Sequence, residues 1–183
     1  MTDASAVLEA REERWQRRLH LARTLKCTVV CCALVVPGSE KHPAWADGVL
    51  EALCGELHDA FERQGICFSE VEDLVTADGR YKLLAVHGDS HEIKRCCVSV
   101  EEASHVGRLA DFDVMCEKGT VIGRAELGLA PRTCLLCSAP AAVCVRARRH
   151  SLHEIQMRVN TLVTPYCRER GVSVPDGFQE RRC

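Results

Sequence analysis

The fold is decided by the stretch Gly107-Arg108-Leu109-Ala110-Asp111-Phe112-Asp113-Val114-Met115-Cys116, in which two carboxylates interrupt an apolar run. Side chains two residues apart in a strand project from the same face. We therefore expect Asp111 and Asp113 to point one way, and the apolar residues beside them to point to a core on the other side. Parallel carboxylates repel one another unless a cation neutralises them. The spacing is compatible with a Mg²⁺ site, and also with two solvated acids on an exposed face.

Local patterns around this stretch predict strands and helices in alternation. Residues 109–116 and 120–124 form a predicted hairpin, and the turn signal Asp78-Gly79 predicts a second one. Apolar runs rich in β-branched residues predict strands at 27–36, 66–76 and 80–87. Helical periodicity predicts helices at 5–25, 43–65, 90–104 and from 152 to Pro165, and the proline kinks or ends the last helix. Residues 127–149 have no clear period and are predicted to be an ordered loop. We expect an α+β fold, with a mixed or antiparallel sheet of about five strands and three to four helices.

Length and composition set limits on the class of protein. The chain has 183 residues and a net charge of -2, so we expect one domain at 1–174 with a polar tail at 175–183, no nucleic acid partner and no membrane span. Thirteen cysteines without an export signal indicate a reducing, cytoplasmic compartment. Most of these thiols are expected to be free and buried as small apolar side chains.

Two cationic segments are candidate anion sites. The loop Pro37-Gly38-Ser39-Glu40-Lys41 joins a predicted strand to a predicted helix, where backbone N–H groups and Lys41 would bind phosphate, although a plain turn fits the same pattern. Arg146, Arg149 and His150 precede the predicted last helix, and guanidinium groups match phosphate oxygens. A solvated basic loop is the alternative interpretation of this second segment.

A third pattern is Cys134-x2-Cys137-x6-Cys144-x5-His150, with His153 as an alternative fourth member. Thiolate and imidazole ligands at such spacings form tetrahedral zinc sites. A chain with so many cysteines contains a Cys-x2-Cys pair by chance, so ordinary packed thiols remain the alternative.

The motif Gly107-Arg108-Leu109-x-Asp111-x-Asp113-Val114 is similar to that of the apo-citrate lyase phosphoribosyl-dephospho-CoA transferase family, also called the holo-acyl-carrier-protein synthases of citrate lyase. The similarity covers most of the chain from about residue 8 to 165. Its further motifs are Leu127-Gly128-Leu129-x-Pro131-Arg132-x-Cys134-Leu135-x-Cys137, Pro140-Ala141, Cys144, Arg146, Arg149-His150-Ser151, Arg11-Glu12-Glu13-Arg14 and Pro37-Gly38-x-x-Lys41.

The resemblance implies a nucleotidyltransferase. A serine of the citrate lyase acyl carrier protein would attack the α-phosphate of 2′-(5″-triphosphoribosyl)-3′-dephospho-CoA and release pyrophosphate, with Mg²⁺ or another divalent cation as cofactor. The implied roles are metal binding by Asp111 and Asp113, phosphate binding by Arg108 and by the loop of Gly38 and Lys41, and contacts of Arg146, Arg149 and His150 with the substrate or the carrier. A nucleotidyltransferase-like core would place two carboxylates on such a strand.

Three questions stay open at this point. The general base would be one of the two carboxylates or His105, and a third metal ligand would come from Glu101, Glu102, His105 or Glu126. Two other functions fit the same residues: a non-catalytic, zinc-stabilised module that binds a partner, and a nucleotidyltransferase that acts on another carrier, such as that of malonate decarboxylase.

Overall fold

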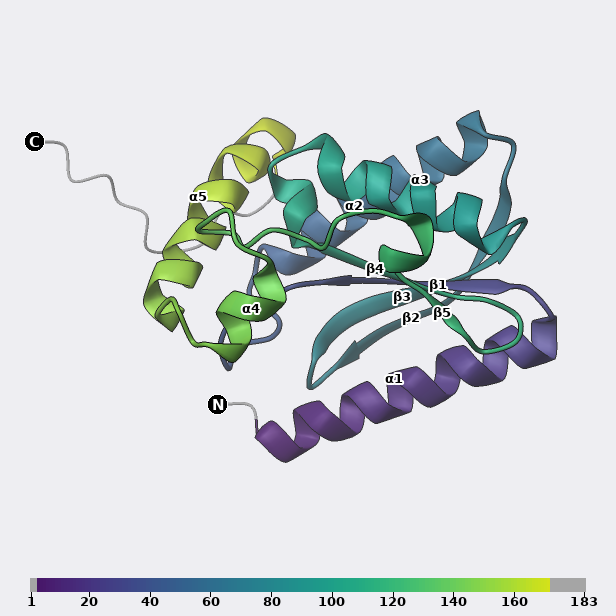
Figure 1. The fold of residues 1–183 in the computed structure, drawn as a ribbon, viewed down its shortest axis with the longest axis horizontal. Helices are drawn as coiled ribbons and strands as arrows, with labels where there is room; N and C mark the ends of the chain where they lie inside the picture. Colours follow the sequence, from purple (N-terminus) through teal and green to yellow (C-terminus); the bar gives the residue numbers. More distant parts are fainter. Residues whose placement is uncertain (1–2, 172–183) are drawn as a thin grey trace, which may run out of the picture.

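The computed structural model describes residues 3–171, so the predicted polar tail at 175–183 lies outside the described residues. Five antiparallel strands form one sheet in the order β2-β3-β1-β4-β5. Helix α1 covers one face, and α2, α3 and α5 lie on the other (Figure 1). The elements are α1 (Ala4–Leu25), β1 (Thr28–Leu34), α2 (Ala46–Arg63), β2 (Cys67–Thr76), β3 (Gly79–His87), α3 (Ser90–Ala103), the 3₁₀ turn η1 (Val106–Leu109), β4 (Ala110–Met115), β5 (Val121–Ile122), the 3₁₀ turn η2 (Ala125–Leu127), α4 (Ala141–Arg146) and α5 (Leu152–Arg170).

The apolar run of β1 occupies the centre of the sheet, with β3 on one side and β4 on the other. Val30 and Cys32 face the larger core under α2 and α3, whereas Val29 and Cys31 face α1. A strand that is covered on both faces is expected to be continuously apolar. The predicted α+β class is confirmed, and the sheet is antiparallel throughout.

The predicted hairpin at Asp78-Gly79 joins β2 and β3. Gly79 has φ +99°, a backbone conformation that favours glycine, and a Cβ at this position would lie 2.6 Å from the carbonyl oxygen of Lys41. The turn therefore packs closely against the loop at 37–41, and Asp78 is placed beside the first candidate anion site.

The hairpin of β4 and β5 also forms, but its return strand is shorter than predicted. Only Val114 and Met115 of β4 pair with β5. The chain then leaves the sheet at Gly123, whose N–H donates to the Glu126 carboxylate at the start of η2. The outer edge of β4 near Phe112 consequently has no neighbouring strand.

Two sequence expectations require correction. The segment at 127–149 contains the short helix α4 as well as loop, because six residues are too few to give a clear helical period. Helix α5 does not end at Pro165 but continues to Arg170. Val163 and Cys167 are fully buried on either side of the proline, and this packing offsets the backbone hydrogen bond that proline cannot make.

Candidate active site

Asp111 and Asp113 lie on the face of β4 that α1 covers. In the pairing register they stand opposite Ala33 and Cys31 of β1, and Cys31 packs toward α1. Both carboxylates are partly exposed, whereas Phe112 between them is buried in the core on the other face. The structure thus places both acids on one face, as the strand spacing predicts.

The two carboxylates differ in how well positive charges neutralise them. Arg18 of α1 is buried, and its Nη1 lies 2.9 Å from Oδ2 of Asp113. Burial and the neighbouring Asp113 raise the pKa of Asp111, while the positive charges of Arg132 and Arg14 lower it. Asp111 is therefore a partly buried carboxylate whose charge is incompletely neutralised. This donor set fits a hard divalent cation, which prefers carboxylate oxygens.

None of the four candidate third ligands joins the pair in a metal-binding group of side chains within residues 3–171. Glu102 forms an ion pair with Arg124, and Glu126 accepts the N–H of Gly123. Glu101 is buried in contacts of its own, and His105 is exposed before η1. Bound Mg²⁺ commonly completes its coordination with water and substrate phosphate oxygens, so two protein carboxylates are enough for such a site.

Three arginines of α1 lie on the side of the helix that faces the candidate site, and we call Arg11, Arg14 and Arg18 the arginine row. Their spacing of three and four residues places them on one face of the helix, toward the sheet. Arg11 donates two hydrogen bonds to Asp78, and Nη2 of Arg14 lies 2.9 Å from the same carboxylate. The arginine row was not predicted from the sequence as part of a site, although its helical spacing and the motif at 11–14 are signals that could have identified it.

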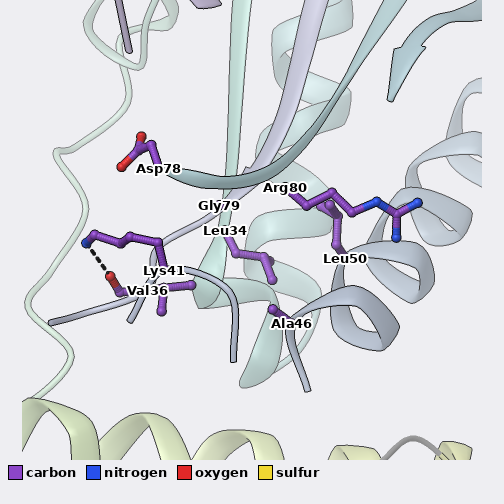
Figure 2. Close-up of a pocket in the computed structure, with 8 residues that line it drawn as sticks. All are labelled: Leu34, Val36, Lys41, Ala46, Leu50, Asp78, Gly79 and Arg80. Carbon is purple, nitrogen blue, oxygen red and sulfur yellow. Dashed lines mark hydrogen bonds between the residues drawn. The ribbon is translucent and has the colours of Figure 1, made fainter. Parts of the chain in front are cut away.

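The loop at 37–41 brings Lys41 to the same region. Figure 2 shows Lys41 and Asp78 along one wall of a small pocket, with Nζ of Lys41 donating to the carbonyl oxygen of Val36 at 2.8 Å. Burial lowers the pKa of Lys41. Helix α2 begins only at Ala46, so its first N–H groups are not part of this loop. Gly38 has φ +101°, and a Cβ there would lie 2.8 Å from the side chain of Gln156 on α5.

Three other arginines that were predicted to bind anions lie around residues 132–144, which carry Cys134, Cys137 and Cys144 and which we call the cysteine segment. The guanidinium of Arg108 donates to the carbonyl oxygens of Thr133 at 2.6 Å and Cys134 at 3.1 Å. Arg146 and Arg149 are exposed on and after α4. Arg108 therefore ties η1 to the cysteine segment, while the two exposed arginines have side chains available to a partner.

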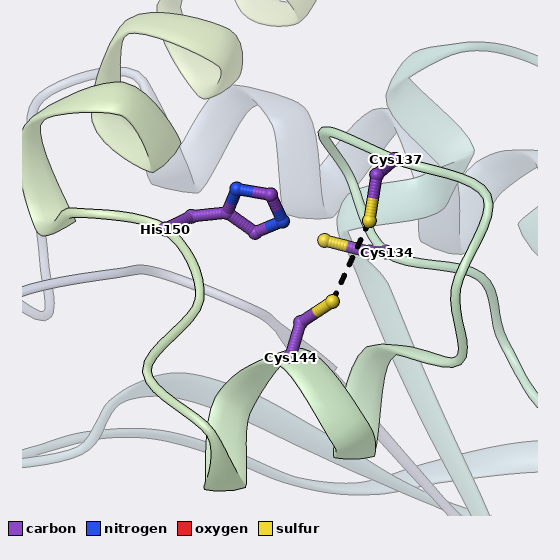
Figure 3. A group of neighbouring side chains, drawn as sticks. All are labelled: Cys134, Cys137, Cys144 and His150. Atoms are coloured by element: carbon purple, nitrogen blue, oxygen red, sulfur yellow. Dashed lines mark hydrogen bonds between the residues drawn. The ribbon is translucent and has the colours of Figure 1, made fainter.

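The residues Cys134, Cys137, Cys144 and His150 come together, and we call them the Cys/His cluster (Figure 3). Their ligand atoms all lie within 4.8 Å of one another. Nε2 of His150 is buried without a hydrogen-bond partner, and a ring nitrogen of His150 faces the sulfur atoms. His153 is exposed on α5 and is not a member of the cluster.

Nearby N–H groups and thiols shift the pKa values of the cysteines in the Cys/His cluster. The N–H of Leu136 lies 3.5 Å from Sγ of Cys134. The N–H of Ala139 is the main cause that lowers the pKa of Cys137 to about 6, whereas burial and the neighbouring thiols raise the pKa of Cys144 to about 11. Crowded thiols bind a cation as thiolates, so the Cys/His cluster is a set of residues that can hold a metal ion.

None of the helices within residues 3–171 is long and apolar enough to cross a membrane.

Comparisons with known proteins identify the family of this chain. A family model described as apo-citrate lyase phosphoribosyl-dephospho-CoA transferase matches residues 2–166. Relatives with that description from Escherichia coli O139:H28 (strain E24377A / ETEC), Escherichia coli O8 (strain IAI1) and Shigella flexneri serotype 5b (strain 8401) are each 29% identical over 157 residues, or 86% of this chain and 86% of the relative. The chain therefore belongs to the apo-citrate lyase phosphoribosyl-dephospho-CoA transferase family.

Proposed function

We propose that this protein transfers 2′-(5″-triphosphoribosyl)-3′-dephospho-CoA to a serine of the citrate lyase acyl carrier protein and releases pyrophosphate. The observation that carries the proposal is the shared face of Asp111 and Asp113 opposite the arginine row, in a chain of this family. Carboxylates for a metal ion and guanidinium groups for phosphates are the parts that nucleotidyl transfer requires. A cytoplasmic location is part of the proposal.

The reaction forms a bond between the serine oxygen and the α-phosphorus and breaks the bond from that phosphorus to the oxygen that bridges the β-phosphate. Mg²⁺ held by Asp111 and Asp113 would neutralise phosphate charge and polarise the phosphorus centre. Arg11 and Arg14 are oriented by Asp78 and keep further N–H donors for the phosphate oxygens. Arg18 holds the carboxylate of Asp113 in place.

The other residues that were predicted to bind the substrate or the carrier are proposed to act through charge, through packing or through contacts with the partner. Lys41 adds positive charge next to the arginine row, and Gly38 allows its loop to pack against α5. Arg108 holds the cysteine segment against η1. Arg146 and Arg149 are the proposed contacts for the carrier or the dephospho-CoA part, because they are exposed next to the Cys/His cluster.

The metal assigned to the Cys/His cluster is zinc in a structural role. Three thiols and one imidazole are a tetrahedral zinc ligand set, and a site with four protein ligands leaves no position for substrate. The ligands come from the loop at 134–137, from α4 and from the residue before the N-cap of α5. Zinc would therefore fix the connection between β5 and α5, a segment with little regular structure.

The activity is tested by incubating the purified protein with the precursor, Mg²⁺ and the apo carrier of citrate lyase. Mass spectrometry should show the carrier gaining one prosthetic group, with one pyrophosphate released for each transfer. A carrier whose acceptor serine is changed to alanine is the control, and the malonate decarboxylase carrier is the competing acceptor. Failure to modify the citrate lyase carrier, or a clear preference for the malonate decarboxylase carrier, would contradict the proposed function.

A further inference from the structure

The outer edge of β4 is incomplete where the two catalytic carboxylates lie. Strand β5 pairs with Val114 and Met115 only. The peptide groups that point outward next to the carboxylates belong to Phe112, the residue between Asp111 and Asp113. Phe112 is only 1% exposed, so its N–H and C=O need partners within the protein.

Two side chains of α3 take the place of the missing strand. Oε1 of Glu101 accepts the N–H of Phe112 at 3.2 Å, and Nζ of Lys94 donates to the Phe112 carbonyl oxygen at 2.5 Å. Both side chains are buried, and Nζ of Lys94 lies 3.9 Å from Oε1 of Glu101. Buried charges are retained only where such partners exist. Glu101 and Lys94 thus bracket the residue that separates the two catalytic acids.

Glu101 also contacts the segment that carries the Cys/His cluster. Nη2 of Arg132 lies 2.7 Å from Oε1 of Glu101, and Nη1 of Arg124 lies 3.5 Å from Oε2. The carbonyl oxygen of Arg132 accepts the N–H of Ala141, at the base of the loop that contains Cys134. One buried carboxylate therefore joins the catalytic strand to the cysteine segment.

We propose that Glu101 is a positioning residue for the carboxylates of Asp111 and Asp113, and that Arg132 couples it to the Cys/His cluster. Oε1 of Glu101 is held by Phe112 and Arg132, whereas Oε2 has only the charge of Arg124 at 3.5 Å and no hydrogen bond. We assign Glu101 to holding the strand through Oε1, and metal binding to the two aspartates. The peptide planes on either side of Phe112 set the directions of both catalytic side chains. A metal site tolerates deviations of only about 0.5 Å in its ligands. This inference rests on the proposed role of the two aspartates as metal ligands.

The test compares Glu101→Gln with Glu92→Gln, a change on the same helix at an exposed side chain outside the contacts of Glu101. Glutamine can still accept the N–H of Phe112 but no longer neutralises Lys94 and Arg132. We expect Glu101→Gln to lower kcat about 10- to 100-fold with an unchanged KM for the carrier. Calorimetry without substrate should show about tenfold weaker Mn²⁺ binding. Glu92→Gln should match the wild type in both measurements.

Hydrogen exchange measures the strand directly. In Glu101→Met the N–H of Phe112 loses its acceptor, so its exchange should accelerate at least tenfold, while the N–H of Val30 in β1 stays protected. If Glu101→Met does not fold, Arg132→Gln should give the weaker Mn²⁺ binding at a near-normal unfolding temperature. Wild-type kcat and Mn²⁺ binding in Glu101→Gln would overturn the inference. A wild-type protein that fails to modify the carrier would instead contradict the proposed function, because Mn²⁺ binding and exchange require no carrier.

Discussion

The two candidate metal sites differ in how complete they are. Asp111 and Asp113 provide two carboxylates on one strand face, and no third side-chain ligand joins them among residues 3–171. The Cys/His cluster provides four ligand atoms within 4.8 Å of one another. Catalytic metal sites keep positions open for water or substrate, whereas structural sites are closed by the protein. This difference is the reason for proposing a catalytic metal at the strand and a structural metal at the cluster.

The two proposed metal sites are expected to affect folding in opposite directions. Burial of Asp111 beside a second carboxylate raises its pKa, which means that the ionised pair makes folding less favourable until a cation binds. The Cys/His cluster joins three short segments that otherwise have few buried apolar side chains. Substitutions at the two sites should therefore separate activity from stability.

The largest expected effect is on activity at the strand. Asp113→Asn keeps the size of the side chain but removes a charged metal ligand, and Arg18 loses its ion-pair partner. We expect the rate of carrier modification to fall by at least about 10³-fold, because a bound metal contributes several kcal/mol to such a transition state. Mass spectrometry of the carrier measures the rate. A folded Asp113→Asn protein with full activity would remove the strand from the mechanism.

The next effect is on stability at the Cys/His cluster. Cys144→Ser should reduce bound zinc from one per chain to less than one, as measured by elemental analysis. With free zinc at about 1,000 times the dissociation constant, binding stabilises the fold by about 4 kcal/mol. The loss should lower Tm by about 8–16 °C. Cys67→Ser is the matched control, because Cys67 is an exposed free cysteine outside the cluster. Equal zinc content in the two variants would contradict the structural zinc site.

A smaller effect is expected at the arginine row. Arg14→Gln removes one phosphate donor while Arg11 continues to bind Asp78. We expect KM for the triphosphate precursor to rise about tenfold, since a hydrogen bond to a charged group contributes about 1.5–3 kcal/mol. Steady-state kinetics measures the change. Arg17→Gln, which loses only a contact with Glu72, should retain the wild-type KM. Equal kinetics for both variants would show that the row does not bind substrate.

The placement of Asp111 and Asp113 could be predicted from the sequence, whereas the side chains that surround them could not. The period of two residues in a strand predicts that Asp111 and Asp113 share one face, and the spacing of the cysteines predicts the Cys/His cluster. Both features depend on contacts that are local in the sequence. The contact of Glu101 with Phe112 depends on where α3 lies across the sheet, which no local pattern specifies. The short length of β5 could not be predicted either, because it depends on the contact of Gly123 with Glu126 at the point where the chain leaves the sheet.

The protein partners of the charged side chains could not be predicted from the sequence. Phosphate binding by Arg108 stays a prediction, and in the structure its guanidinium donates to two backbone carbonyls. Lys41 likewise donates to the carbonyl of Val36. Long flexible side chains reach whichever acceptor the tertiary structure offers, and the residue type alone does not identify that acceptor.

The smallest expected effect is a change in Tm caused by the ionised carboxylate of Asp111, which makes folding less favourable. The same substitution at Asp73, a carboxylate on β2, serves for comparison. Asp111→Asn should raise Tm on the order of 2 °C in buffer without added Mg²⁺, because a poorly neutralised charge is removed. Asp73 is the matched control. Arg80 donates to Asp73 at 2.8 Å, and this hydrogen bond lowers the pKa of Asp73. Asp73→Asn should therefore lower Tm by about 2 °C at pH 7.

The control has a defined pH dependence. Because the pKa of Asp73 is lower in the folded protein, its ion pair stabilises the fold at pH values above the ordinary carboxyl pKa, and this stability is lost as the pH falls through the folded pKa. The difference in Tm between Asp73→Asn and the wild type should therefore shrink below about pH 4. Thermal unfolding at pH 7 and pH 3 measures it. If Asp111→Asn lowers Tm at pH 7 as Asp73→Asn does, the two carboxylates are equally well neutralised and the strand site carries no free energy cost for a metal ion to relieve.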